Sequence, residues 1–150
     1  MTHFNTSLSV GKIRENEICN FIRRKYSLAF VVDGYFKGYD IYIPEVDKSI
    51  EVKQDYKSYY TGNFLVEIEF EGIESGLSTT IADFWVFVDR QYYIWVTPET
   101  LWLLINERNL KPKKFIGKGD TKEKKAYLIP RKMLIYSPYV VLTKLPIDKN

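Results

Sequence analysis

Two short runs, Asp40-Ile-Tyr-Ile43 and Ser49-Ile-Glu-Val-Lys53, decide how this 150-residue chain is interpreted. Both are rich in β-branched residues and bounded by turn-forming residues, which is typical of neighbouring β-strands. Side chains alternate between the two faces of a strand, so Glu51 and Lys53 point the same way. If Asp40 begins the adjacent strand, its carboxylate can reach Glu51. The runs therefore predict two carboxylates and one ammonium group close together on a sheet.

This combination of groups suits the hydrolysis of a phosphodiester. Two hard oxygen ligands fit Mg²⁺, which keeps several waters and completes its coordination with substrate phosphate oxygens. A lysine beside such an ion can orient the attacking water and offset the charge of the transition state. We therefore expect Asp40 and Glu51 to bind Mg²⁺ and Lys53 to position the water. Because Glu-x-Lys is also common by chance, the alternative is that Glu51 and Lys53 form the solvated face of an edge strand.

The segment from Val10 to Tyr26 has the periodicity of an amphipathic helix and precedes both runs. Its apolar residues recur at the helical period and form one arc of the helix surface. Glu15 and Glu17 lie inside this arc or at its edge, where a carboxylate is costly unless it is paired or binds a metal ion. One of them is therefore a candidate for the metal site. Glu15 is favoured, although the sequence also allows both carboxylates to reach solvent.

Between this helix and Asp40, the apolar run from Ser27 to Val32 predicts a buried strand. The order is then helix, strand, strand, strand, with acids on the helix and at the start of the second strand, and Glu-x-Lys on the third. From about residue 8 to residue 55, this order resembles the PD-(D/E)XK nuclease superfamily. One position departs from the family's motif, because Tyr39 precedes Asp40 where the family has proline.

The resemblance implies a metal-dependent DNA endonuclease with an α/β fold, in which helices flank a mixed sheet. It implies that Asp40 and Glu51 are the metal-binding acids and that Lys53 is the catalytic lysine. Glu15 matches the acid that the first helix contributes to the metal site. Gln54 follows Lys53, at a place where a polar residue often supports the site in relatives. The implied cofactor is Mg²⁺.

The chain as a whole also resembles a homing endonuclease encoded in a cyanobacterial group I intron, within the same superfamily. That likeness implies a sequence-specific double-strand break in a long DNA target. One site per chain means that at least two chains, related by a two-fold axis, must cut a duplex, and a dimer of dimers suits a long target. Two alternatives are a Holliday-junction resolvase, which shares the order of acids and lysine, and a non-catalytic DNA-binding protein.

The net charge is only +3, but basic residues are concentrated between Arg108 and Lys132. This segment has ten basic residues against two acidic ones, a charge of +8, which leaves −5 for the rest of the chain. Such a concentration is the electrostatic footprint of a protein that binds phosphate backbones. The alternative is a solvated loop that serves solubility. The predicted DNA-binding residues here are Lys111, Lys113, Lys114, Lys118, Lys122, Lys124, Lys125 and Arg131.

Ser78 and Thr79 belong to a hydroxyl-rich loop between Gly72 and Thr80. Hydroxyl side chains often contact phosphates and fix the register of a duplex, so both residues are predicted DNA contacts. They suit the capping of a turn equally well.

With 45% hydrophobic and 16% aromatic residues, the chain predicts one globular domain over residues 1–150. A single cysteine and a single histidine exclude an intrachain disulfide and a Cys/His zinc site. Cys19 lies near the apolar arc of the helix and is expected to be a packing residue. No apolar run approaches the roughly 18 residues of a membrane helix, so we expect a cytoplasmic protein that associates with nucleoid DNA when it acts.

The rest of the chain alternates between strands and helices. Asn63 to Glu71 alternates apolar and acidic residues, which predicts a strand whose glutamates suit a solvated face better than a second metal site. Asp83 to Asp89 and Tyr92 to Val96 predict a central hairpin. Thr97 caps a helix that runs to about Glu107. The last predicted elements are a strand and short helix from Ala126 to about Ile135, and a strand from Tyr139 to Leu145.

The twelve tyrosines include two adjacent pairs, Tyr59-Tyr60 and Tyr92-Tyr93. The first pair is interleaved with lysine, which suits rings that stack on nucleic-acid bases or line a DNA groove. Ordinary packing in a core explains such rings equally well, so the sequence leaves the role of both pairs open.

Overall fold

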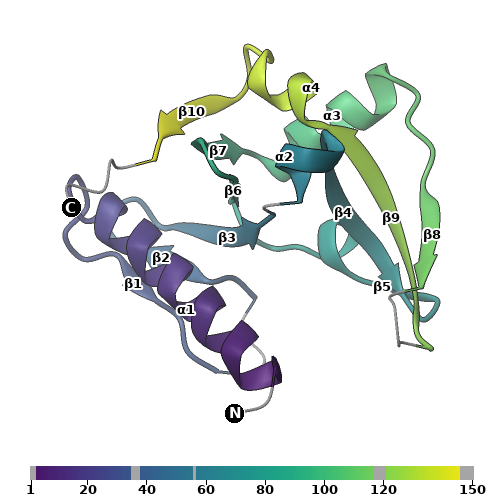
Figure 1. The fold of residues 1–150 in the computed structure, drawn as a ribbon. Helices are drawn as coiled ribbons and strands as arrows, with labels where there is room; N and C mark the ends of the chain where they lie inside the picture. The colour runs from purple at the N-terminus through teal and green to yellow at the C-terminus, as the bar shows by residue number, and fades with distance from the viewer. Residues whose placement is uncertain (1–2, 35–37, 56, 117–120, 146–150) are drawn as a thin grey trace.

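The computed structural model describes residues 3–34, 38–55, 57–116 and 121–145. Over these residues the chain forms a mixed α/β structure with two β-sheets and four α-helices (Figure 1). The predicted α/β class is therefore confirmed. The mixed sheet is accompanied by a second, antiparallel sheet that the sequence did not predict.

The larger sheet contains six strands and carries the candidate site. In spatial order the strands are β1 (Phe30–Val31), β2 (Ile41–Ile43), β3 (Lys48–Gln54), β6 (Phe84–Val88), β7 (Tyr92–Val96) and β10 (Val141–Lys144). β3 and β6 are parallel, and every other neighbouring pair is antiparallel. The predicted strands that carry Asp40 and Glu51, and the predicted β6–β7 hairpin, are confirmed to within one residue at each end.

Helix α1 (His3–Ile22) covers one face of this sheet (Figure 1). Its buried residues Ile18 and Cys19 pack against Ile41 of β2 and Ile50 of β3. The predicted amphipathic helix is confirmed, but it is shifted toward the N-terminus and ends before Tyr26.

The segment after α1 differs from its prediction. The chain turns here, with the Tyr26 N–H donating to the carbonyl of Ile22 and the Ala29 N–H donating to the carbonyl of Tyr26. These local bonds use backbone groups that a strand would need, so β1 is only two residues long. Phe30 is exposed. The prediction of a buried strand from Ser27 to Val32 was therefore wrong.

The smaller sheet has four antiparallel strands and packs on the other face of the six-stranded sheet. Its spatial order is β5 (Ile73–Glu74), β4 (Asn63–Phe70), β9 (Glu123–Pro130) and β8 (Lys113–Ile116). Phe64 of β4 and Ile129 of β9 share a core with Trp85 and Phe87 of β6. The six-stranded sheet is thus buried between α1 on one side and the smaller sheet on the other.

Helix α3 (Pro98–Glu107) closes the end of this second core. Thr97 caps it, its hydroxyl oxygen accepting from the Thr100 N–H at 3.1 Å. Leu101 and Leu104 are buried in the same core, so the predicted helix is confirmed with its cap and its apolar face. The short elements are α2 (Ser58–Thr61), the 3₁₀ turn η1 (Gly76–Ser78) and α4 (Arg131–Ile135).

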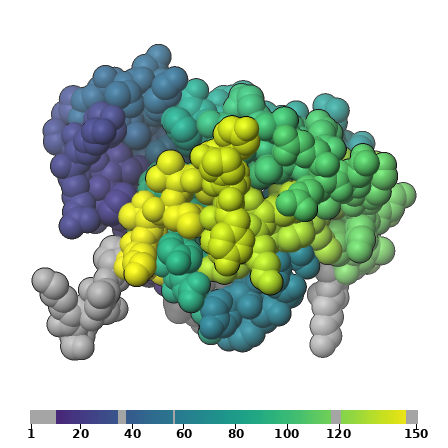
Figure 2. Space-filling model, turned by 90° about the horizontal axis from the view of Figure 1, so that it is seen from above, coloured from purple at the N-terminus to yellow at the C-terminus, as the bar shows by residue number. Residues whose placement is uncertain are grey.

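The C-terminal part of the chain runs across the molecule. The segment of α4 and β10, yellow in Figure 2, lies between the N-terminal part and the part formed by α3 and β8. β10 pairs with β7 and forms one edge of the six-stranded sheet. The predicted strand between Tyr139 and Leu145 is therefore confirmed.

The basic segment contains a strand that the sequence did not predict. β8 pairs with β9 in an antiparallel hairpin, with Lys114 opposite Lys125. The only lysine of the predicted DNA-binding set that lies outside the described residues is Lys118, between the two strands. The solvated loop that stood as the alternative for this segment is therefore not formed where β8 lies.

Candidate active site

Asp40 stands immediately before β2, and hydrogen bonds of its backbone and its carboxylate hold it against the neighbouring segments. Its N–H donates to the Ile50 carbonyl at 2.9 Å, and its own carbonyl accepts from the Val32 N–H at 2.8 Å. Its carboxylate oxygen Oδ2 accepts from the Val52 N–H at 2.7 Å. The carboxylate therefore lies against the β3 backbone at the residue between Glu51 and Lys53. With only 6% of its surface exposed, Asp40 is a buried acid in a fixed position.

The acids and the lysine share one face of the sheet. Ile41, Ile50 and Val52 point toward α1, because they belong to the core under that helix. Alternation along each strand puts Asp40 and then Glu51 and Lys53 on the opposite face. The predicted convergence of the two strands is therefore present in the structure.

Glu51 and Lys53 form an ion pair at the edge of solvent. The distance from Lys53 Nζ to Glu51 Oε1 is 3.4 Å, and the two side chains are 39% and 23% exposed. A half-exposed pair of this kind is held weakly, because water screens its attraction. Both groups can therefore turn to a ligand without the cost of opening a buried pair.

Trp85 of β6 lies beneath the ammonium group of Lys53. Its register partner across the parallel β3–β6 pair is Glu51, and its ring centroid lies 4.9 Å from Lys53 Nζ. The ring is 2% exposed, and its indole N–H donates to the Thr80 hydroxyl at 3.0 Å. A buried tryptophan face attracts an ammonium group by a cation–π interaction. Trp85 therefore limits where the Lys53 ammonium can sit.

The sequence did not single out Trp85 or Thr80. β6 was predicted only as an apolar central strand, and nothing local in its sequence indicates which residue of β3 it meets. The contact depends on the parallel pairing of two strands that are separated by α2, β4, β5 and η1 along the chain.

Glu15 and Glu17 of α1 have different surroundings. Both oxygens of Glu17 accept from Arg14 Nη1, at 2.8 and 2.7 Å, on the exposed side of the helix. Glu17 is therefore a surface ion-pair residue. Glu15 is partly buried, and its Oε2 atom is shielded from solvent. Of the two acids, Glu15 is the one directed away from bulk water.

The donor set of this site suits one class of metal ion. Asp40 and Glu51 supply hard carboxylate oxygens, and Mg²⁺ is commonly bound by one or two carboxylates with water and phosphate oxygens. Within the described residues, no group of three or more His, Cys, Asp or Glu side chains gathers closely enough to hold a metal ion. Asp40, Glu51 and Glu15 therefore do not form such a group, and Glu15 belongs to α1, which covers the opposite face of the sheet. Asp40 and Glu51 remain the two acids that fit Mg²⁺ shared with a phosphate ligand. A closed structural zinc site, with four protein ligands, does not fit.

Gln54 lies on the other side of the strand. It follows Lys53, so alternation directs its side chain to the face of Val52, toward α1. Gln54 is therefore not beside Lys53 on the face that carries the acids, and its predicted supporting role has no contact there.

A groove of about 820 Å³ lies on the α1 side of the six-stranded sheet. Its walls are mainly apolar and include Phe21, Ile43 and Trp95, with Lys25 and Lys48 also lining it. None of the lining residues is acidic. The groove is thus on the face opposite the acids and the lysine, and it has no group for phosphodiester chemistry.

Most basic side chains of the β8–β9 hairpin are exposed, and several have weak partners. Lys111 and Lys113 are exposed. Lys114 lies 3.4 Å from Glu123, and Lys124 lies 4.0 Å from Glu67, in pairs that water screens. Two further lysines, Lys122 over the ring of Phe70 and the half-buried Lys125, continue the basic surface along β9. Ser78 and Thr79 are exposed at the end of η1.

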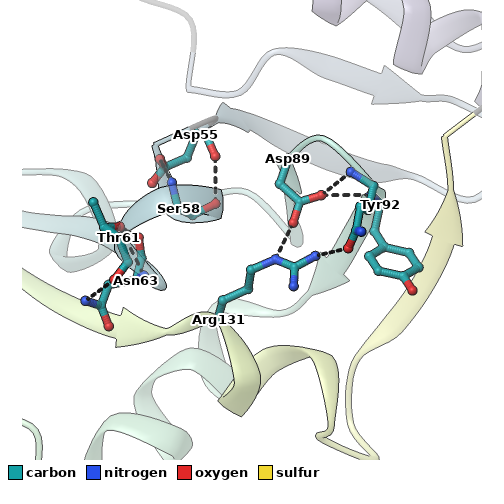
Figure 3. A network of polar contacts seen from close by, with 8 residues as sticks. Asp55, Ser58, Thr61, Asn63, Asp89, Tyr92 and Arg131 are labelled. Atoms are coloured by element: carbon teal, nitrogen blue, oxygen red, sulfur yellow. Dashed lines mark hydrogen bonds and ion pairs between the residues drawn. The ribbon is translucent and has the colours of Figure 1, made fainter.

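Arg131 differs from these lysines because its side chain is bound to a buried acid. Its Nε donates to Asp89 Oδ2 at 2.6 Å, and its Nη2 donates to the side-chain carbonyl of Gln91 at 2.9 Å. Asp89 is fully buried and also accepts from the Gln91 and Tyr92 backbone N–H groups. Figure 3 shows Arg131 directed at Asp89. The guanidinium group is thus engaged in joining α4 to the β6–β7 turn, which the charge count could not reveal.

Cys19 is completely buried on the side of α1 that faces the six-stranded sheet. Burial raises the pKa of its thiol above the ordinary value, and the nearby Arg23 opposes this only in part. The thiol therefore stays protonated and has the packing role that its place on the helix predicts.

No protein-family model, curated protein or solved structure matches this chain. Within the described residues, no helix has both the length and the apolar character that crossing a membrane requires.

Proposed function

We propose that the chain is a Mg²⁺-dependent DNA endonuclease with a PD-(D/E)XK-type core. The observation that carries this proposal is the hydrogen bond from the Val52 N–H to the Asp40 carboxylate. It joins the first acid to the strand position that separates Glu51 from Lys53. This arrangement supports hydrolysis better than a solvated edge strand, because β3 is an interior strand and Asp40 is buried.

Asp40 and Glu51 would hold the ion between the sheet and the substrate phosphate. When bound, Mg²⁺ neutralises phosphate charge and lowers the pKa of a coordinated water. The buried Asp40 provides a carboxylate in a fixed position, because Oδ2 accepts from the Val52 N–H of β3 and the Asp40 N–H donates to the Ile50 carbonyl of the same strand. Glu51 is more exposed than Asp40, and water screens its ion pair with Lys53.

Lys53 would orient the attacking water and stabilise the negative charge that develops on the phosphate oxygens. Trp85 holds the ammonium from below, and Glu51 holds it from the side. The ammonium group can donate hydrogen bonds to water or phosphate. Water would attack phosphorus in line with the departing 3′ oxygen, so that the new P–O bond forms as the P–O3′ bond breaks. The attacking water loses a proton to solvent, and the 3′ oxygen takes a proton from solvent and leaves as a hydroxyl group.

The exposed lysines of the β8–β9 hairpin would bind the DNA backbone. A two-stranded β-ribbon fits the major groove of DNA, and its lysines can neutralise phosphates on either side. We infer a homing endonuclease that makes a double-strand break at a long target. Because one chain has one such site, a dimer is the smallest assembly that cuts both strands, and a tetramer extends the surface that reads the target.

Cleavage of supercoiled plasmid tests this proposal. The plasmid should carry a library of intronless insertion sites, and the reactions should contain either Mg²⁺ or a chelator. We expect wild-type protein to give a discrete linear product with Mg²⁺ only, and Lys53→Ala to give none. Lys144→Ala, an exposed lysine on β10, is the matched control and should cut like wild type.

Other outcomes of the same experiment would favour one of the two alternative functions, a resolvase or a non-catalytic DNA-binding protein. Cleavage confined to added four-way junctions would identify a resolvase. Salt-sensitive DNA binding without any Mg²⁺-dependent break would identify a DNA-binding protein and would overturn the proposal.

A further inference from the structure

Two tyrosines and an arginine form an exposed cluster just beyond the end of β3. Tyr59 and Tyr60 of α2 are 49% and 70% exposed. The Arg90 guanidinium carbon lies 4.6 Å from the ring centroid of Tyr60 and 5.5 Å from that of Tyr59. The two rings are 5.6 Å apart and nearly perpendicular, at 89°. The cluster thus presents two aromatic rings with a cation between them.

The first end of α2 is held at the end of β3, the strand that carries Glu51 and Lys53. Ser58 is completely buried. Its N–H donates to Asp55 Oδ1 at 3.1 Å, and its hydroxyl donates to the Asp55 carbonyl at 2.8 Å (Figure 3). The Asp55 N–H donates in turn to the carbonyl of Val88, at the end of β6. Tyr59 and Tyr60 therefore follow a buried anchor and are not on a loose loop.

The second end of α2 is fixed by the same network that fixes Arg90. Gly62 has a left-handed backbone conformation, and its carbonyl accepts from the Arg131 N–H at 2.8 Å. The side chain of Arg131 is bound to Asp89, the residue before Arg90. In Figure 2, α2 and the β6–β7 turn lie at the surface beside α4. One buried ion pair thus positions both the rings and the cation.

The two tyrosine pairs of the sequence differ in how far they are buried. Tyr93 is 2% exposed and packs in the core under α1, whereas Tyr59 and Tyr60 lie outside both cores. Rings that remain in solvent on a fixed frame are typical of binding surfaces, where tyrosine and arginine provide much of the affinity. Packing therefore explains Tyr93 and leaves the exposed pair without a structural role.

The charge of the cluster indicates what it would bind. Arg90 and the exposed Lys57 are cationic, and the carboxylate of Asp55 is occupied by the Ser58 and Leu65 N–H groups. A surface with aromatic faces and positive charge suits a ligand with aromatic rings and negative charge. Nucleotides combine both, since bases stack on tyrosine and phosphates bind arginine.

We propose that Tyr59, Tyr60 and Arg90 bind a single DNA strand beside the site of cleavage. The ring of Tyr60 stacks on an unpaired or unstacked base, and Arg90 contacts the adjacent phosphate. Lys53 and this cluster lie toward the same end of β3, so a strand whose phosphate is at Lys53 continues onto α2. The identity of the ligand as DNA rests on the proposed function.

Binding without catalysis tests this inference. The probes are a fluorescein-labelled 20-nucleotide oligothymidine and a labelled duplex of random sequence, followed by fluorescence anisotropy in chelator. Loss of one base-stacking ring weakens binding by roughly tenfold, so we expect that loss for Tyr60→Ala with the single strand. Tyr60→Phe keeps the ring and should bind like wild type. Arg90→Gln should reduce the slope of log affinity against log salt by about 0.7, as expected for one phosphate contact on a single strand.

Tyr139→Ala is the matched control, because Tyr139 is 62% exposed on the connection between α4 and β10. It should leave both affinities unchanged. Equal affinity of Tyr60→Ala and wild type for the single strand would overturn the inference, and so would an equal loss in Tyr60→Phe and Tyr60→Ala.

The two proposals fail separately in these experiments. If wild type cleaves plasmid but Tyr60→Ala binds the single strand normally, the inference is wrong and the nuclease stands. If Tyr60→Ala loses binding but wild type never cleaves, the cluster binds DNA and the nuclease proposal is wrong. If wild type binds neither probe, both proposals are wrong.

Discussion

Two ion pairs at the ends of neighbouring parallel strands differ in almost every respect. At β3, Glu51 and Lys53 are 3.4 Å apart and are 23% and 39% exposed. At the end of β6, Asp89 and Arg131 are 2.6 Å apart, with the acid fully buried and the arginine 18% exposed. Both pairs join an acid to a base, but only the first has access to a substrate.

The difference in burial distinguishes an ion pair that stabilises the fold from an ion pair that can act on a substrate. The Asp89 carboxylate is fully buried and accepts from Arg131 and two backbone N–H groups, so a ligand cannot reach it. Arginine suits this role because its guanidinium is rigid and always charged. Lysine suits the β3 site because its compact ammonium can change partners, and Trp85 restricts it without saturating it.

The largest expected effect is on cleavage by variants of the exposed pair. Lys53→Met and Glu51→Gln should each lower the single-turnover cleavage rate by about a thousandfold, the upper range for removing one electrostatic stabiliser. An exposed ion pair contributes only about 0–1 kcal/mol to stability, so the melting temperature should barely change. Rates and thermal denaturation measured on the same preparations check this. If a variant loses activity because it unfolds, the Glu51–Lys53 pair has a structural role like that of the Asp89–Arg131 pair.

The buried pair should give the opposite result. Arg131→Met leaves the Asp89 charge without its partner, which costs about 3 kcal/mol of unfolding free energy. For a chain of this length the melting temperature should fall by roughly 10 °C. Urea denaturation measures the loss, with Lys132→Met, the adjacent exposed lysine, as the control. A stable Arg131→Met protein that no longer binds DNA would instead make Arg131 a DNA contact.

A smaller effect on the cleavage rate is expected when Trp85, which lies beneath the Lys53 ammonium group, is changed. Trp85→Phe weakens the cation–π contact by about 1 kcal/mol, which corresponds to a roughly fivefold slower cleavage. Ile94→Val removes volume from the same core on β7, a strand that does not pair with β3, so it should lose stability and keep its rate once folded. Cleavage rates below the melting transition of each variant distinguish the two. Equal slowing in both would mean that Trp85 acts only through packing.

The smallest effect is expected from single lysines of the hairpin. Lys113→Gln removes one exposed cation from β8, so the slope of log affinity against log salt should fall by about 0.9 for duplex DNA. Lys144→Gln on β10 should leave the slope unchanged. If the slope is unchanged in both variants, the hairpin does not contact the DNA backbone.

The elements around the β3 site could be predicted because their signals are local. Alternation and turn residues fix β2 and β3, and the Thr97 cap with its following proline fixes the start of α3. The candidate acids and Lys53 were found by the same alternation. Glu17 could be separated from Glu15 only in three dimensions, where Arg14 holds it at the surface.

The remaining features depend on contacts between distant segments. β8 is rich in lysine and has no apolar alternation, so it becomes a strand only because β9 provides a pairing partner. Trp85 reaches Lys53 through the parallel β3–β6 pair, and Arg131 reaches Asp89 across 42 positions of sequence. A charge count gives Arg131 and Lys113 equal weight, whereas burial separates them.

Binding of a divalent ion tests the central claim most directly, because it requires neither a DNA target nor an assembled dimer. Titration of Mn²⁺ as a substitute for Mg²⁺, followed by the electron paramagnetic resonance signal of the free ion, should show one site per chain in the wild type. Asp40→Asn and Glu51→Gln should lose this site, whereas Glu74→Gln, an exposed acid on β5, should retain it. Equal Mn²⁺ binding by wild type, Asp40→Asn and Glu51→Gln would contradict the account, since the two acids at β3 would then have no part in holding a metal ion.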